Sequence, residues 1–218
     1  MGWVKNIAFG VLAFLAVLFG LVLYYHNSVF VLDGPDNGFL LTKTASVRHS
    51  VYLPAFYIHI VTGSIVLMTG IFQLRTWIRT RFATWHRLAG KIYIFVILIF
   101  TAPSGLVMSL FANGGLAAGT GFALLALLWW FFTWKGFQNA IQERWDEHRK
   151  FMIRSYALTF SAVTLRLYSF FFALAGYRGE FTYVMIAWLS WVPSVIAVEI
   201  YLRQKTAGRV MKSMLAKN

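Results

Sequence analysis

Three histidines and one arginine lie where their side chains could do chemistry. His59, His86, His148 and Arg166 all fall within or at the ends of long apolar stretches. Ionisable groups inside a membrane are costly to insert, and they commonly mark ligand sites or proton pathways. The chain has no cysteine, which excludes disulfides, thiolate metal sites and cysteine nucleophiles. The available chemistry is therefore imidazole ligation, proton transfer and the binding of an anion by arginine.

His86 and His148 each stand at the start of an apolar stretch, and both stretches are expected to run outward from the same membrane face. Two imidazoles at one depth can ligate a single haem iron from opposite sides. The positive end of a helix favours neutral imidazole, and Gly90, one turn from His86, leaves room for a flat macrocycle. Arginines near both histidines could pair with the haem propionates: Arg87, Arg149 and Arg154. We therefore predict a haem b held by His86 and His148.

Two other interpretations of these inner histidines stay open at the level of the sequence. A nonhaem metal could use both imidazoles together with a carboxylate of Asp146 or Glu147. Alternatively, each histidine and the arginine that follows it lie at the membrane interface and bind lipid phosphates, which requires no cofactor.

His59 and Arg166 define a second polar level, nearer the outer face. A rise of 1.5 Å per residue places both about 13 Å from the outer ends of their spans. A mid-membrane arginine costs about 2.5–3.5 kcal/mol, so Arg166 needs an anionic ligand, water or backbone carbonyls, or it must extend toward the surface. We predict that His59 and Arg166 bind a quinone or another amphiphile and relay protons. Two further residues complete the predicted ligand-binding set: Gln73, expected near the level of His86 and His148, and Thr159, on the polar face of span five.

Six apolar stretches must position these residues. Hydrophobic residues make up 59% of the chain and charged residues 12%, whereas a soluble domain carries about 25% charged residues. This composition excludes a soluble enzyme, a disordered chain and a nucleic-acid-binding domain. A helix needs about 20 apolar residues to cross a bilayer, and the stretches that qualify are about 4–25, 51–74, 88–111, 116–137, 151–175 and 181–202. The first lacks a small-residue cleavage site, so we expect it to be a retained anchor.

The basic residues predict how the spans are oriented. Most of the 20 lysines and arginines precede the first span, lie between spans two and three or four and five, or follow span six. By the positive-inside rule these segments are cytoplasmic. We therefore predict an all-α, polytopic membrane protein with a single integral domain over residues 1–218, six transmembrane helices, and both termini in the cytoplasm.

Polar and small residues recur at steps of three and four on three of the spans, a pattern that marks helix contacts in membranes. On span two the stripe comprises Ala55, His59, Gly63, Val66, Gly70 and Gln73. On span three it comprises His86, Gly90, Ile94, Ile97, Thr101 and Gly105. On span five it comprises His148, Met152, Ser155, Thr159, Ala162, Arg166 and Ser169. We predict that these three spans pack together, that spans one and six lie outside, and that Pro103 marks a hinge.

The segments that carry these residues resemble a known family. The relevant motifs run through Tyr57–Gln73, His86–Tyr93 and His148–Arg166. From about Tyr57 to Tyr168 the chain is similar to the bacterial membrane family catalogued as domain of unknown function 2306, with Phe151 where that family often has tryptophan. The resemblance implies a multi-pass protein of the bacterial inner membrane and no established activity. It marks as motif positions His59, Gln73, His86, His148, Arg154 and Arg166.

The leading functional prediction is a membrane redox protein, or a subunit of a membrane redox complex, that uses haem b and binds a quinone. Its layout of histidines on packed helices is similar to that of b-type haem cytochromes, although fold alone does not imply function. The alternatives are a cofactor-free protein that binds or transports a small anion or lipid, and a structural subunit of a larger complex. Membrane lipids are expected partners and nucleic acid is not. Signatures of serine nucleophiles, P-loops and dinucleotide sites are absent, and no enzymatic reaction is identified.

Overall fold

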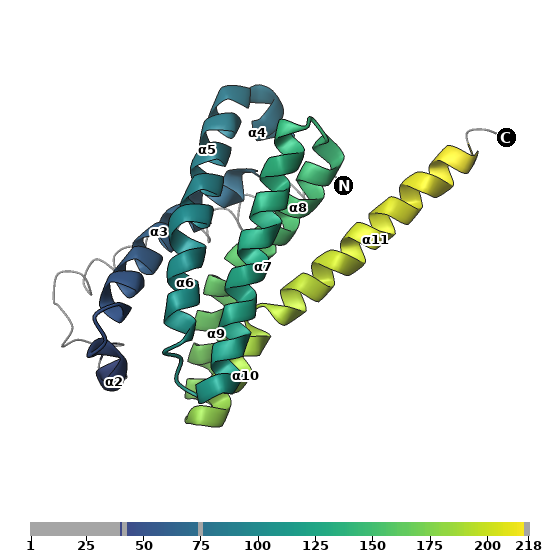
Figure 1. Ribbon diagram of the computed structural model, residues 1–218. Helices are drawn as coiled ribbons and strands as arrows, with labels where there is room; N and C mark the ends of the chain where they lie inside the picture. Colours follow the sequence, from purple (N-terminus) through teal and green to yellow (C-terminus); the bar gives the residue numbers. More distant parts are fainter. Residues whose placement is uncertain (1–39, 41–42, 74–75, 216–218) are drawn as a thin grey trace.

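The computed structural model describes residues 40, 43–73 and 76–215, and every regular element within them is helical (Figure 1). The all-α prediction is therefore confirmed for this part of the chain. The predicted first span, residues 4–25, lies outside the described residues. The number of spans and the cytoplasmic location of both termini consequently stay predictions.

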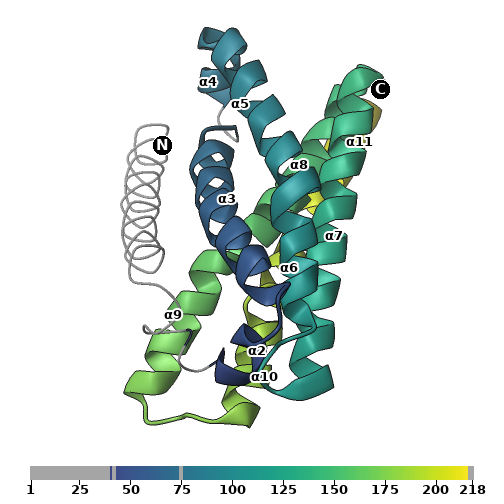
Figure 2. The same cartoon turned by 60° about the vertical axis from the view of Figure 1, so that its left-hand side comes forward.

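Within the described residues, five helical segments are long and apolar enough to cross a membrane, and they correspond to predicted spans two to six. They are Tyr52–Gly70, Ala83–Ser109, Gly115–Ile141, Trp145–Leu174 and Glu180–Gly208. The helices that form them are α3 (Tyr52–Gln73), α5 (Ala83–Val96), α6 (Ala102–Ser109), α7 (Gly115–Ile141), α8 (Trp145–Thr159), α9 (Ser161–Leu174), α10 (Glu180–Leu189) and α11 (Val192–Leu215). Two short helices, α2 (Thr44–Val47) and α4 (Thr76–Arg81), lie near opposite ends of α3 (Figures 1 and 2).

Two helices begin earlier than the apolar stretches predict. α5 starts at Ala83 and α8 at Trp145, so each extends about one turn beyond the predicted span start. Both extensions carry tryptophan and charged residues, which suit the membrane interface. In α8 the acidic residues Asp146 and Glu147 lie in the first turn, where the helix dipole favours negative charge. His86 and His148 are consequently each the fourth residue of their helix.

The third predicted span is interrupted where the sequence predicts a hinge. A π-helical segment, Ile97–Thr101, joins α5 to α6. In a π-register the carbonyl of Leu98 would accept a bond from the N–H five residues later, but that residue is Pro103 and has no N–H. The indole Nε1 of Trp130 on α7 donates to the Leu98 carbonyl instead, at 3.2 Å. The helix therefore forms a wide turn just before Pro103, and Trp130 of α7 supplies the hydrogen bond that the Leu98 carbonyl would otherwise lack.

The predicted contact among spans two, three and five is confirmed. α3 contacts α5, α6 and α8, and Tyr93 of α5 bonds to two residues of α8. The residues of the three polar stripes are buried or half-buried, except Ser169, which is exposed. Leu158, which lies outside the polar stripe of span five, is only 1% exposed because a fourth helix covers that side. This helix is α7, which packs along α8; α11 extends away from the bundle (Figure 1).

Candidate functional site

His86 and His148 occupy equivalent places at one end of the bundle. Each lies in the first turn of a helix, α5 or α8, and both helices start at the same end (Figure 1). The two imidazoles are close enough to interact electrostatically. Both side chains are half-buried. The predicted common level of the two histidines is therefore reproduced in three dimensions.

The ring of His148 is held by one specific hydrogen bond. Its Nδ1 lies 2.8 Å from the carbonyl oxygen of Gly136 on α7. Because a carbonyl oxygen can only accept, Nδ1 must carry the proton, and in the neutral ring Nε2 keeps the free lone pair. A backbone carbonyl that fixes one ring nitrogen in this way is the usual support of a metal-ligating histidine.

The ring of His86 has a buried nitrogen that lacks a protein partner. Its Nδ1 is inaccessible to solvent and makes no hydrogen bond with any residue that the structure describes. A buried polar atom without a partner costs free energy, and it commonly indicates a water, ion or cofactor at that position. His86 thus presents an unsatisfied nitrogen and His148 a free lone pair at the same end of the bundle.

A cavity of about 330 Å³ adjoins His86 on the side of α3 and α4. Its walls are almost wholly apolar, with only two polar side chains. The lining residues are Gln73, Trp77, Ile78, Phe82, Trp85, His86 and Ala89. His148 is not among them.

Gln73 lies at the inner level, as predicted, and contacts the same helix as His86. Its Oε1 is 3.5 Å from the position that a Cβ atom on Gly90 would take. The amide therefore covers the glycine at which the sequence predicts room for a macrocycle. A macrocycle at Gly90 requires the Gln73 side chain to rotate away.

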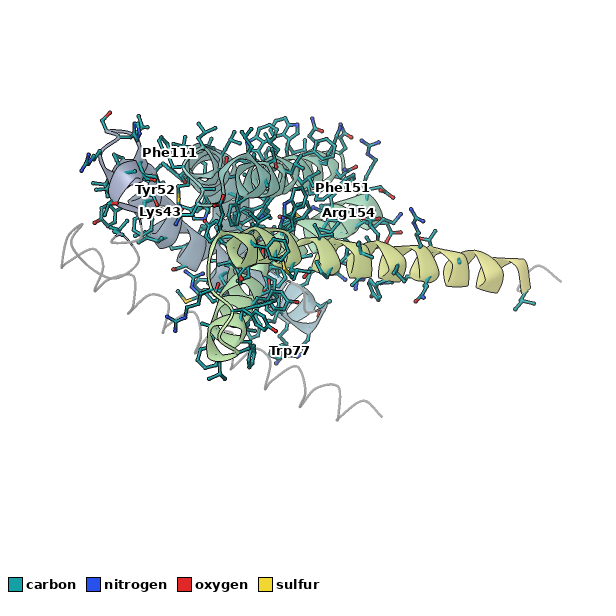
Figure 3. All side chains as sticks on the ribbon, turned by 90° about the horizontal axis from the view of Figure 1, so that it is seen from below. Lys43, Tyr52, Trp77, Phe111, Phe151 and Arg154 are labelled. Carbon is teal, nitrogen blue, oxygen red and sulfur yellow. The ribbon has the colours of Figure 1, made fainter. Side chains whose placement is uncertain are left out.

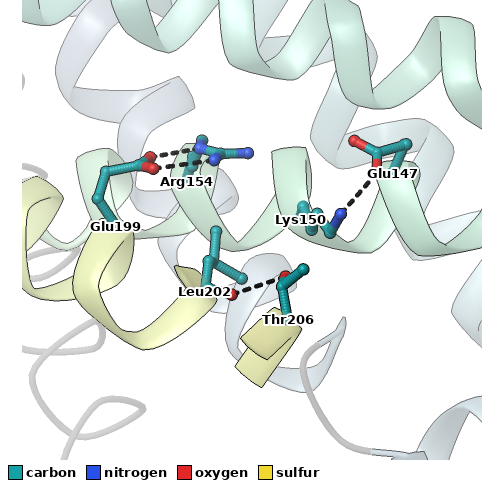
Figure 4. Close-up of polar contacts among 6 residues, drawn as sticks. All are labelled: Glu147, Lys150, Arg154, Glu199, Leu202 and Thr206. Carbon is teal, nitrogen blue, oxygen red and sulfur yellow. Dashed lines mark hydrogen bonds and ion pairs between the residues drawn. The ribbon is translucent and has the colours of Figure 1, made fainter. Parts of the chain in front are cut away.

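The three arginines predicted to serve a haem differ in their surroundings. Arg154 donates to Glu199 of α11 through Nε and Nη2, at 2.5 and 3.0 Å (Figure 4). Its guanidinium also lies 5.3 Å from the ring centre of Phe151. A propionate at Arg154 would compete with this carboxylate. Arg87 is exposed and Arg149 half-buried, and these two are the cations more readily available to a propionate.

The described residues provide little support for the nonhaem metal interpretation. They contain no group of three or more histidine, cysteine, aspartate or glutamate side chains that could hold a metal ion. Glu147 pairs with Lys150 at 2.6 Å (Figure 4), and Asp146 is exposed. A haem needs only two axial ligands from the protein, so this finding does not bear on the haem prediction.

The middle of the bundle holds a buried cluster of hydroxyl groups that the sequence analysis did not identify as a site. The hydroxyl of Tyr93 lies 3.0 Å from Ser155 Oγ and 2.7 Å from Thr159 Oγ1. Thr133 of α7 lies 2.7 Å from the same Ser155 Oγ. Thr159, predicted as a ligand-binding residue, is therefore engaged in a structural contact. One pattern in the sequence could have predicted that α7 packs against α8. Small and polar residues recur on α7 at a spacing of three: Thr133, Gly136 and Asn139.

His59 lies at the outer level, on the α6 side of α3. Its Nδ1 is 2.9 Å from the carbonyl oxygen of Thr101 at the end of the π-helical segment. A Cβ atom on Gly105 would come within 2.9 Å of the His59 ring, so only glycine permits this approach. The ring is again fixed through Nδ1, which leaves Nε2 with the free lone pair in the neutral form.

Arg166 of α9 is the charged group that acts on His59 from a distance. The two groups interact electrostatically, and Arg166 Nη1 donates to the Ala162 carbonyl at 2.9 Å. No acidic side chain within the described ranges forms an ion pair with this guanidinium. The structure thus leaves Arg166 within electrostatic range of His59. It places Gln73 at the opposite end of the bundle and Thr159 between the two levels.

Comparison with known proteins assigns the family but no activity. Neither the search of curated proteins nor that of solved structures found a match. The family model described as "Predicted membrane protein (DUF2306)" matches residues 56–202. This segment contains every candidate residue discussed above and covers more than half of the chain. We conclude that the chain is a multi-pass integral membrane protein that belongs to the DUF2306 family.

Proposed function

We propose that this protein is a redox protein of the bacterial inner membrane, or a redox subunit of a larger membrane complex, that holds a haem b between His86 and His148. The proposal rests on the hydrogen bonding of the two neighbouring imidazoles. His148 is fixed through Nδ1 on the Gly136 carbonyl, and His86 has a buried nitrogen without a partner. His148 thus has the carbonyl support that is usual for a metal-ligating histidine, and the unpartnered nitrogen of His86 favours a ligand beside that ring.

Each surrounding residue then has a definite task. The Gly136 carbonyl selects the tautomer of His148 and orients its ring. Arg87 and Arg149 compensate the charge of the propionates. A bound haem b would supply one-electron transfer, while the protein would supply axial ligands, charge compensation and a dry environment. The proposed cytoplasmic position of the site follows from the basic residues at this end of the bundle.

The test is the absorption spectrum of the protein purified in mild detergent from haem-replete cells, together with its iron content. We expect a Soret band and stoichiometric iron, both lost in His86→Ala and His148→Ala. His49→Ala is the matched control, because this exposed histidine lies outside the site and should leave the spectrum unchanged. A folded, colourless wild-type protein without iron would overturn the proposal.

The surroundings of Arg166 favour a second candidate, a cofactor-free site for a small anion or an anionic lipid. Within the described part of the chain the guanidinium donates to a backbone carbonyl, that of Ala162, and forms no ion pair. A cation within a span is stabilised by an anionic ligand. We expect labelled carboxylate or phosphate amphiphiles to bind the wild-type protein, and we expect this binding to be lost in Arg166→Gln. Arg178→Gln, at an exposed loop position, is the control. Equal binding by both variants would exclude this candidate.

A further inference from the structure

We propose that the cavity beside α3, α4 and α5 binds the ring of a lipid-soluble quinone. The cavity lies between the end of α3 and the start of α5 and measures about 330 Å³, which is at the lower end of the range for small-molecule sites. The inference rests on the proposed redox function for its biological meaning, but binding itself does not require the haem. The site differs from the outer pocket of His59 and Arg166, where the sequence predicts a quinone.

The walls of the cavity suit a flat, apolar ring. Trp77, Phe82 and Trp85 provide three aromatic side chains, while Ile78 and Ala89 complete the apolar lining. Aromatic rings prefer stacked or edge-on contacts with other flat rings. A quinone ring presents two such faces and carries an apolar tail, so it matches these walls better than a branched or charged molecule does.

The two polar lining residues suit the oxygens of a quinone. Gln73 offers amide N–H groups, and His86 offers Nε2, because its Nδ1 is inaccessible. Both groups can donate to a carbonyl oxygen. A cavity that is apolar except for a few convergent polar groups is the usual form of a specific ligand site. The oxygens of a quinone require such donors and no compensating charge.

The lining does not suit a lipid phosphate. Arg79 and Arg87 affect His86 electrostatically, but neither guanidinium contributes to the cavity wall. A phosphate in the cavity would therefore lie against aromatic carbon without a direct cationic partner, which is unfavourable. The chemistry of the walls thus distinguishes a quinone from an anionic headgroup.

The cavity is accessible from the membrane interface. Trp77 is 62% exposed and Trp85 68% exposed, and Figure 3 shows Trp77 well apart from Lys43, Tyr52 and Phe111. Exposed tryptophans at a span end lie at the headgroup level. A lipid-soluble ligand can consequently enter from the bilayer with its tail still in lipid.

The experiment is a titration of the full-length protein in nanodiscs with decylubiquinone, followed by tryptophan fluorescence. Quinones quench nearby indoles, and two of the nine tryptophans line the cavity. We expect saturable quenching, with an affinity about tenfold weaker in Ala89→Phe, which fills the cavity, and in Gln73→Leu, which removes a donor. Ala197→Phe, at an exposed site on α11, is the matched control and should bind like wild type. Thermal unfolding verifies that each variant is folded.

The outcomes separate this inference from the proposed function. His148→Ala removes a proposed haem ligand but no residue of the cavity wall, so it should lose the Soret band and keep the quinone affinity. Quinone binding by a colourless wild-type protein would support the inference while overturning the haem proposal. Quenching that does not saturate, an unchanged affinity in Ala89→Phe, or equal displacement by decanol, which has no ring, would overturn the inference.

Discussion

The guanidinium of Arg154 and the carboxylate of Glu199 form a two-bond ion pair that joins α8 to α11, with contacts of 2.5 and 3.0 Å (Figure 4). Both side chains are largely shielded, with exposures of 18% and 34%. The pair therefore links the helix that carries His148 to the last span. Because removal of one partner leaves a poorly solvated charge, loss of this contact should lower the free energy of unfolding more than loss of an exposed ion pair does.

Replacement of either partner should destabilise the protein. We expect Glu199→Gln to lower the free energy of unfolding by about 1–3 kcal/mol, measured by thermal unfolding in detergent. The matched control is Glu147→Gln, which removes the more exposed pair with Lys150 and should cost under about 0.5 kcal/mol. An equal effect of the two substitutions would show that the Arg154–Glu199 contact has no special role in stability.

A glycine contact between α3 and two tyrosines gives a second prediction. A Cβ atom on Gly70 would lie 2.6 Å from the ring of Tyr156 and 2.7 Å from that of Tyr93. Both rings are rigid and packed, so Gly70→Ala should destabilise the protein by about 1–3 kcal/mol through overpacking. Gly63→Ala, on the same helix, would approach only a methyl group of Thr101 at 3.8 Å and should be neutral. Comparable melting temperatures for both variants would contradict this account.

The buried hydroxyl cluster gives a third prediction. Tyr93→Phe removes the group that lies within hydrogen-bond distance of both Ser155 and Thr159. Loss of these buried bonds should cost about 1–2 kcal/mol, measured by chemical unfolding. Tyr57→Phe, at a half-buried position outside the cluster, should have little effect. If Tyr93→Phe is as stable as wild type, the cluster is not a structural link between α5 and α8.

The sequence predicts the inward faces of three spans well because polar and small residues are scarce within an apolar background. The stripe through His148, Ser155 and Thr159 is half-buried at His148 and buried at the other two residues, and His59 and Arg166 lie within electrostatic range of each other. These inferences need only helical periodicity and a fixed rise per residue. They can therefore be made without knowledge of the tertiary structure.

The features that the sequence does not predict depend on contacts between segments that are distant in the chain. The pairing of Arg154 with Glu199 joins residues 45 positions apart and follows from the path of α11 after the helix break near Ser190. The role of α7 follows from close approach at Gly136, where a Cβ atom would meet Met152 Sδ at 2.6 Å. The cavity beside His86 needs α4, a short helix with one aromatic residue, the exposed Trp77. Local patterns do not encode these relations.

Burial of Lys43 predicts how stability depends on pH. Its side chain is 4% exposed, its Nζ donates to the Phe111 carbonyl at 2.8 Å and lies 5.6 Å from the ring centre of Tyr183. Figure 3 shows it beside Tyr52 and Phe111. Desolvation lowers the pKa of Lys43 from 10.5 to about 8. The folded protein therefore releases this proton at a lower pH than the unfolded chain does.

Between these two pKa values the unfolded chain binds more protons, so the contribution of Lys43 to the free energy of unfolding rises with pH from about 8 to about 10.5. Below pH 8 burial of the cation imposes a constant penalty. We expect the melting temperature of wild type, relative to that of Lys43→Met, to increase across this window. Lys91→Met, at an exposed position, should follow the wild-type curve. If wild type and Lys43→Met change in parallel from pH 7 to pH 10, the lysine is not desolvated in the folded protein.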